Sequence, residues 1–246
     1  MNAPDPQRLG GLAWVRRTGG RLSRTERRRL LAAIAVGQWD NAVGRVKLAL
    51  GRLPAAAAQV DLGTFQVPDS KFAREAEEAC AELPPTLQGH SYRTWLFGRA
   101  LAAVDRSKVD GELFYCGALL HDYGIVRPTG NRDFTLGSVE RMLSCGTAAE
   151  LAEERADLLA DGICVHTTPG VKVETDGVIG CYLQWGAMVD GAGLRDSGAG
   201  GTLRAARSLW IAASRANGAV RLLSYVVVER LRRSSSVAWK CPIALS

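Results

Sequence analysis

The chain has 246 residues, of which 47% are apolar and 23% are charged, an ordinary composition for a soluble globular protein. Its apolar runs fall far short of the ~18 residues that cross a bilayer, so we expect no membrane partner. The six cysteines are scattered without C-x-x-C spacing, which argues against a disulfide framework or a thiolate zinc site. These features, with no signal-peptide pattern, predict a cytoplasmic protein.

The net charge of +6 is unevenly distributed along the chain. Residues 1–53 carry 11 Lys/Arg against 3 Asp/Glu, a balance of +8, so the remaining 193 residues sum to −2. A basic segment of this kind could contact nucleic acid. No aromatic interleaving or known nucleic-acid module accompanies it, so a solvated helical face is the favoured interpretation.

The predicted elements begin with a flexible lead-in over residues 1–20, which contains two prolines and the pair Gly19-Gly20. The run Ser23-Arg24-Thr25-Glu26 fits a capping box and predicts a helix start, giving a basic N-terminal helical extension over residues 1–69. The body, residues 70–246, has an all-α pattern. Its helices are predicted over residues 70–81, 87–103, 110–124, 136–143, 148–166, 177–189 and 203–233.

Four residues of metal-ligand type stand on these predicted helices. His90 is followed after 31 residues by the doublet His121-Asp122 and after 69 more by Asp190. Adjacent residues point about 100° apart on a helix, so one ion can bind both members of the doublet only near a helix end, where Gly124 places them. A buried carboxylate is costly unless it is paired or coordinates a cation. Imidazole and carboxylate together suit Zn²⁺, Fe²⁺ or Mn²⁺.

Two stretches carry a resemblance to a known family. Gly89-His90-Ser91-Tyr92-Arg93-Thr94 and Ala118-Leu119-Leu120-His121-Asp122-Tyr123-Gly124 closely resemble the H-S-x-R and L-L-H-D-x-G blocks of the HD superfamily of metal-dependent hydrolases. The resemblance covers residues 86–195 and is closest to the cyanamide-hydratase-like branch. His166-Thr167-Thr168-Pro169-Gly170 resembles that branch's H-T-x-P-G block, whose histidine lines the substrate pocket. The stretch ending at Asp190 resembles the block that carries the last ligand.

The resemblance implies an HD-domain helical bundle with one divalent metal ion held by His90, His121, Asp122 and Asp190. Two-metal members usually supply two further histidines between the doublet and the final aspartate, and this chain supplies one, His166. The ion would activate water, because a bound cation lowers the pKa of water toward neutrality. Asp122 could accept a proton, and His166 could orient substrate or shuttle a proton.

Three residues are candidates for contacting substrate. Arg93 and Lys172 could meet an anionic group, and Thr135 stands where a glutamate is often found in the family block. The expected activity is water attack on a small molecule, of the nitrile-like cyanamide type. Phosphohydrolysis of a nucleotide or phosphomonoester is one alternative. A non-enzymatic regulatory or nucleic-acid-binding protein is the other, and a homodimer is a further partner that the sequence allows.

Overall fold

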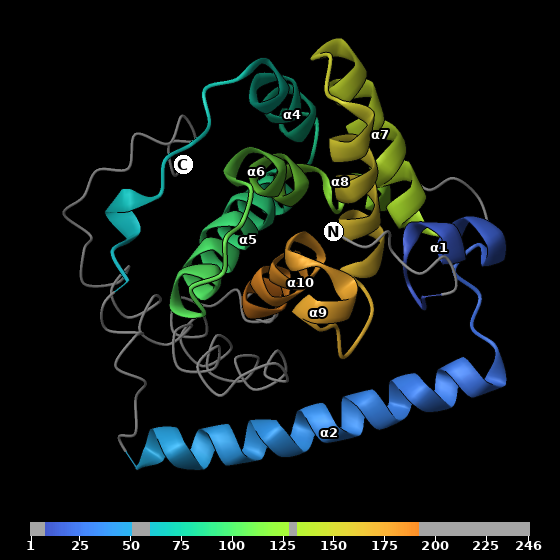
Figure 1. The fold of residues 1–246 in the computed structure, drawn as a ribbon, viewed down its shortest axis with the longest axis vertical. Coiled ribbons are helices and arrows are strands. Elements are labelled where there is room, and N and C mark those ends of the chain that lie inside the picture. Colours follow the sequence, from blue (N-terminus) through green and yellow to red (C-terminus); the bar gives the residue numbers. More distant parts are fainter. Residues whose placement is uncertain (1–7, 51–59, 128–131, 192–246) are drawn as a thin grey trace.

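The computed structural model describes residues 8–50, 60–127 and 132–191 (Figure 1). Its regular elements are all helical, with no strand among the described residues, which confirms the predicted all-α class. No helix in this part of the chain combines the length and apolar character needed to cross a membrane. The predicted helix over residues 203–233 lies outside the described residues.

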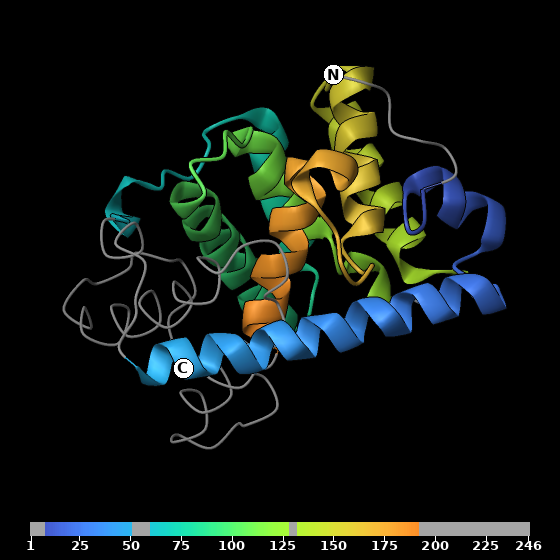
Figure 2. The same cartoon turned by 60° about the horizontal axis from the view of Figure 1, so that its bottom comes forward.

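The elements follow one another as helices joined by short connections. In chain order they are α1 (Leu12–Thr18), α2 (Arg24–Ala49), η1 (Leu62–Thr64), α4 (Lys71–Ala81), α5 (Pro85–Val104), α6 (Gly111–Leu120), η2 (Tyr123–Ile125), α7 (Phe134–Ala148), α8 (Glu153–Val165), α9 (Val173–Asp176) and α10 (Val178–Gly191). Helices α4 to α10 form a bundle, and the long helix α2 runs along one side of it (Figures 1 and 2).

Polar side chains cap several helices as the sequence predicts. The Ser23 and Glu26 side chains each accept a hydrogen bond from the other's backbone N–H, at 3.2 Å from Glu26 N to Ser23 Oγ and 2.7 Å from Ser23 N to Glu26 Oε2. Ser70 caps α4, and Asp110 caps α6 through two backbone N–H groups. Pro85 begins α5, two residues earlier than predicted, because the first helical position needs no N–H donor.

The predicted flexible lead-in is wrong where the structure describes it. Helix α1 buries Leu12, Trp14 and Val15 and packs against α8. The Arg8 guanidinium pairs with the carboxylate of Asp161, whose other oxygen accepts a hydrogen bond from Leu12 N at 3.0 Å. Composition near the prolines and glycines suggested a loose segment, but tertiary packing of the intervening apolar residues orders it.

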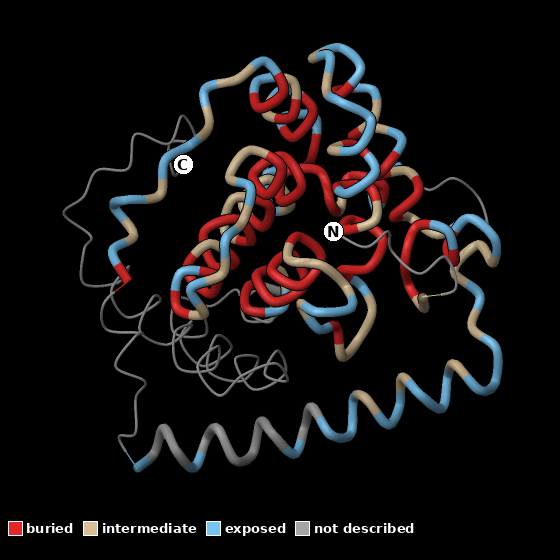
Figure 3. The backbone as a smooth tube through the Cα atoms, in the orientation of Figure 1, coloured by how far each residue is buried: buried red, intermediate tan, exposed pale blue. Residues whose placement is uncertain are grey.

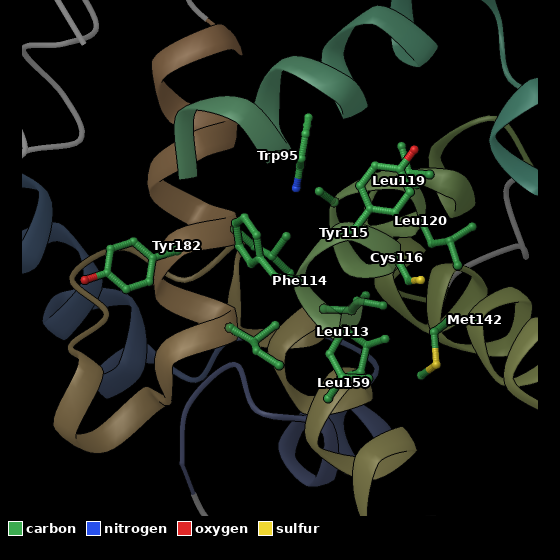
Figure 4. Close-up of a cluster of buried hydrophobic side chains, with 14 of the residues drawn as sticks. Trp95, Leu113, Phe114, Tyr115, Cys116, Leu119, Leu120, Met142, Leu159 and Tyr182 are labelled. Atoms are coloured by element: carbon green, nitrogen blue, oxygen red, sulfur yellow. The ribbon is translucent and has the colours of Figure 1, made fainter. Parts of the chain in front are cut away.

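The core is centred on α6, which is buried on nearly every side (Figure 3). Apolar side chains from neighbouring helices surround it: Figure 4 shows Met142 of α7 and Leu159 of α8 beside it, and Leu183 of α10 lies with Leu159 over Gly117. A helix that is apolar all round is stable only inside such a shell. The end of α6 therefore lies in the interior of the bundle, where its last residues lead into the His121-Asp122 doublet.

Helices α5 and α10 pack closely and antiparallel. A Cβ atom at Gly98 would lie 2.6 Å from the carbonyl oxygen of Tyr182, and one at Gly186 would collide with the carbonyl oxygen of Thr94. Glycine at both positions lets the two backbones approach to a distance that no larger residue permits. This contact holds the middle of α5 against α10, and the antiparallel direction brings the first turns of α5 beside the last turn of α10, where His90 meets Asp190.

Candidate metal centre

The three histidines of the chain meet at one place in the bundle. His90 comes from α5, His121 is the C-cap of α6 and His166 is the C-cap of α8. The Nε2 atoms of His90 and His121 are 3.3 Å apart, and the rings of His121 and His166 meet edge to face with centroids 4.9 Å apart. All three side chains are buried.

The carboxylate of Asp122 lies at the centre of these three rings. Its Oδ2 is 3.5 Å from His90 Nε2 and 3.4 Å from His121 Nε2, and its Oδ1 is 3.5 Å from His166 Nε2. His121 still has helical backbone angles, whereas Asp122 has left the helix, with φ −105° and ψ 8°. This change at the end of α6 lets both adjacent side chains face one point, as the doublet predicts.

Each histidine has an oxygen acceptor at its other ring nitrogen. The Nδ1 atom of His90 is 2.7 Å from Asp190 Oδ2, that of His121 is 2.8 Å from the Ala118 carbonyl, and that of His166 is 2.5 Å from the Ile163 carbonyl. Carbonyl and carboxylate oxygens only accept, so we assign a proton to each Nδ1. All three Nε2 atoms then face Asp122.

His121 and His166 make the same local hydrogen bond. Each ends a helix and donates to the carbonyl three residues earlier, a backbone group that the helix end leaves without an intrahelical partner. The same bond therefore satisfies the helix terminus and fixes the imidazole. This repeated arrangement explains why both histidines stand at the last turn of an apolar helix.

The electrostatics of the cluster favour a cation. Burial lowers the pKa of His121 to about 4, so its ring is neutral near pH 7. Burial alone would raise the pKa of Asp122, but the positive charge of His121 when protonated, a hydrogen bond with His166 and the charge of the other rings outweigh it and hold that pKa well below its usual range. An anionic carboxylate thus lies among imidazole nitrogens in the interior. A positive ion would complement this arrangement.

The donor set fits a divalent metal ion. His90, His121 and Asp122 each offer one ligand atom, and these atoms lie within 4.8 Å of one another. Two imidazole nitrogens and one carboxylate oxygen form a group that could bind Zn²⁺, Fe²⁺ or Mn²⁺. Three of the four predicted ligands are therefore brought together.

The fourth predicted ligand, Asp190, is close to the cluster but behind His90. Its Oδ2 accepts the hydrogen bond from His90 Nδ1, and the Arg93 guanidinium donates to Oδ1 at 2.5 Å and to Oδ2 at 3.0 Å. Burial would raise the Asp190 pKa, but the bonds from His90 and Arg93 lower it overall. In this arrangement Asp190 orients His90, as carboxylates commonly do behind metal-binding histidines.

The structure separates the three predicted substrate contacts. Arg93 reaches the cluster through Asp190. Thr135 is buried and belongs to the cap of α7, where its hydroxyl donates to Asp133 Oδ1 at 2.7 Å. Lys172 has an exposed side chain, and its backbone N–H donates to Asp176 Oδ2 at 2.8 Å. The Thr135 hydroxyl therefore has a local partner outside the cluster, and the Lys172 side chain is exposed.

Sequence reasoning missed two residues that hold His166 in place. The Gln184 side chain donates to the His166 carbonyl at 2.9 Å and also to the Thr168 carbonyl, which ties the loop after α8 to α10. The ring of Phe134 meets that of His166 edge to face, with centroids 6.3 Å apart. The buried amide in the apolar stretch before Asp190 was the signal for Gln184, because a buried polar group needs partners.

Comparison of the chain with family models, with curated proteins and with solved structures finds no match in any of the three.

Proposed function

We propose that the chain is a metal-dependent hydrolase or hydratase of the HD type, acting on a small molecule with one divalent ion at the cluster. The observation that carries the proposal is the convergence of three histidine Nε2 atoms on the carboxylate of Asp122. Each Nδ1 is bonded to an oxygen acceptor, which leaves the Nε2 atoms and the Asp122 carboxylate to bind a cation.

His90, His121 and Asp122 would hold the ion, and Asp190 would orient His90 from behind. A divalent ion in such a site lowers the pKa of bound water, which supplies a nucleophile near neutral pH. The described residues contain one set of three close donors, which is enough to bind a single ion.

The two oxygens of Asp122 have different neighbours, which suggests separate roles. Oδ2 faces the Nε2 atoms of His90 and His121, whereas Oδ1 faces His166 Nε2 at 3.5 Å. Oδ1 is thus free of the metal-binding pair and can accept a proton from the attacking water. His166 beside it can take up that proton or deliver one to the substrate.

The charges around the cluster favour a neutral substrate over a phosphate ester. The guanidinium of Arg93 directs two of its nitrogens to Asp190, and so its charge is already paired. Lys172, the other predicted cation, precedes α9 and has an exposed side chain. A phosphoryl group is usually bound by unpaired Arg or Lys donors. A nitrile-like substrate of the cyanamide type is therefore the first choice, with phosphohydrolysis as the alternative.

The test combines metal analysis with two activity assays on the full chain. We expect elemental analysis to find one divalent ion per chain and a cyanamide-to-urea assay to show metal-dependent turnover. Phosphate release from a panel of nucleotides and phosphomonoesters would select the alternative instead. Purified protein that binds no divalent ion when titrated with Zn²⁺, Fe²⁺ or Mn²⁺ would refute the proposal.

One observation supports a nucleic-acid-binding role in addition. Arg24, Arg27, Arg28 and Arg29 are all exposed in the first turns of α2. Clustered arginines neutralise phosphates, and that kind of binding weakens steeply as salt rises. Binding of duplex DNA at 50 mM salt that is lost at 200 mM would support this role, and no binding at 50 mM would exclude it.

A further inference from the structure

Helix α2 exposes large apolar side chains over most of its length. Val36, Trp39, Val46 and Leu50 are 49%, 71%, 59% and 65% exposed. None of the extensive helix–helix contacts in the described residues involves α2, which runs beside the bundle (Figures 2 and 3). A run of exposed apolar residues on one helix marks a surface that packs against a partner.

These residues follow a heptad pattern. Ala32, Val36, Trp39, Val43, Val46 and Leu50 are spaced alternately by four and three residues, and we call this set the α2 seam. The run Ala35-Val36-Gly37 recurs seven residues later as Ala42-Val43-Gly44. An alternating four–three spacing of apolar residues is the pattern by which helices pair in coiled coils.

The α2 seam lies on a different side of the helix from its partly buried residues. Among the α2 residues whose burial is described, Glu26, Leu30 and Ala33 are partly buried, and they share one side of the helix. At about 100° per residue this side lies roughly a third of a turn from the centre of the seam. Trp14 Nε1 of α1 donates to Glu26 Oε1 at 2.7 Å on this side of α2, which leaves the seam open to another molecule.

We propose that the α2 seam pairs with the α2 seam of a second copy of this chain, with the two helices antiparallel. One register pairs all six positions, placing Val36 against the partner's Val46, Val43 against the partner's Trp39, and Leu50 against the partner's Ala32. In every pair an a position of one helix meets a d position of the other. Trp39 and Leu50 meet the smaller Val43 and Ala32. An interface of this kind is two-fold symmetric and closes as a dimer.

Charge selects the antiparallel orientation. In a parallel pair the exposed Arg24, Arg27, Arg28 and Arg29 of both copies would lie side by side. Arginines that lie side by side repel one another. The antiparallel register places the arginines of the two copies at opposite ends of the helix pair. Position 28 of one copy then lies 26 residues along the axis from position 28 of the other. At a rise of 1.5 Å per residue this separation is about 39 Å.

The first experiment measures the mass of the full chain by sedimentation equilibrium. We expect a dimer for the wild type and at least a 100-fold weaker self-association for Trp39→Glu. Leu31→Glu is the matched control, because Leu31 is 59% exposed on the same helix but lies off the seam. A monomeric wild type, as when another part of the chain covers the seam, would overturn the proposal. So would equal weakening by both variants with unchanged circular dichroism.

The second experiment tests orientation by spin-label distance measurement on Arg28→Cys in a Cys241→Ser background. The other five cysteines are buried, and burial raises the pKa of the Cys116 and Cys181 thiols, which keeps them unreactive. A distance of about 39 Å is expected for the antiparallel pair. A distance below about 20 Å would show a parallel pair and overturn the assigned orientation.

Discussion

Asp190 and His90 lie 100 residues apart in the sequence and share a hydrogen bond of 2.7 Å, from His90 Nδ1 to Asp190 Oδ2. The bond turns the Nε2 atom of His90 toward His121 and Asp122. It makes Asp190 a determinant of metal affinity whether or not its carboxylate touches the ion.

The first prediction concerns Asp190→Asn. An amide carries no charge, and its NH₂ group only donates, so it cannot accept all three bonds that the Asp190 carboxylate accepts from His90 and Arg93. The His90 ring then loses its fixed orientation. We expect metal affinity to fall about 10- to 100-fold, as for other partners of metal-binding histidines. Competition with a chelator measures this. Asp105→Asn is the control, since Asp105 is a half-buried carboxylate at the other end of α5, bonded to Tyr182. Unchanged affinity in Asp190→Asn would contradict the role.

The second prediction is that His121→Ala loses bound metal and activity together. His121 is completely buried and supplies one of the three close donors, so the two remaining ligands cannot retain the ion. Elemental analysis of the purified variant provides the measurement, with circular dichroism as the check on folding. Full metal occupancy in this variant would show that the ion, if any, binds elsewhere.

The third prediction separates His166 from the ligands. His166→Ala should retain the metal, because the three close donors come from His90, His121 and Asp122, and His166 Nε2 faces the Asp122 oxygen that lies away from His90 and His121. Turnover should fall about 100-fold, the lower range for loss of a group that transfers protons. Metal content and kcat are measured on the same preparation. An unchanged kcat would leave His166 with a packing role only, and loss of metal would make it a ligand.

The fourth prediction tests the packing of α5 against α10. Gly186→Ala forces its Cβ against the Thr94 carbonyl, which must push the two helices apart. We expect a loss of about 1–3 kcal/mol in unfolding free energy, as for other overpacked sites. The thermal midpoint should drop by roughly 2–4 °C per kcal/mol. Gly111→Ala is the control, because the nearest atom to a Cβ there is 4.0 Å away. Equal midpoints for the two variants would contradict the close approach.

The fifth prediction is a pH dependence at the cap of α6. Burial would raise the pKa of Asp110, but hydrogen bonds from the Leu113 and Glu112 N–H groups and from Arg155 lower it overall. A lowered folded pKa means that the charged cap stabilises the protein above the unfolded pKa of about 3.9 and that this contribution is lost as pH falls through the folded value.

Asp110→Ala should therefore cost about 1 kcal/mol of unfolding free energy at pH 7, and the difference from wild type should shrink at pH 3. Urea unfolding at both pH values measures it. Asp69→Ala is the control, since Asp69 forms an ion pair with Arg74 on the surface, where such pairs contribute little. A cost that is the same at both pH values would contradict the role of the charge.

Much of the fold could be predicted from local patterns, because helix caps depend on residues close in sequence. The capping box at Ser23 and Glu26 and the cap at Asp110 are confirmed. The end of α7 was predicted five residues too early, because the stretch after Leu143 has few apolar residues and its helical state depends on packing against α4, where Cys145 Sγ bonds to the Glu75 carbonyl. The order of α1 likewise depends on Asp161, a partner about 150 residues away.

The site likewise has residues that the sequence predicts and residues whose role depends on tertiary packing. Residue type and spacing were enough to select His90, His121 and Asp122, because few polar groups stand on apolar helices. The role of Asp190 depends on which His90 nitrogen it meets, and this is set by the approach of α5 to α10. Thr135 was assigned to substrate because of its place in a family block, whereas the structure shows it bonded to Asp133.

The position of Asp190 on the last described helix has a consequence for synthesis of the protein. Translation proceeds from the N-terminus, so His90, the doublet and His166 leave the ribosome before α10. A nascent chain can therefore hold every nitrogen donor of the cluster while the residue that orients His90 is still missing. The cluster reaches its final geometry only when α10 docks against α5, and an ion that enters earlier meets an unoriented histidine.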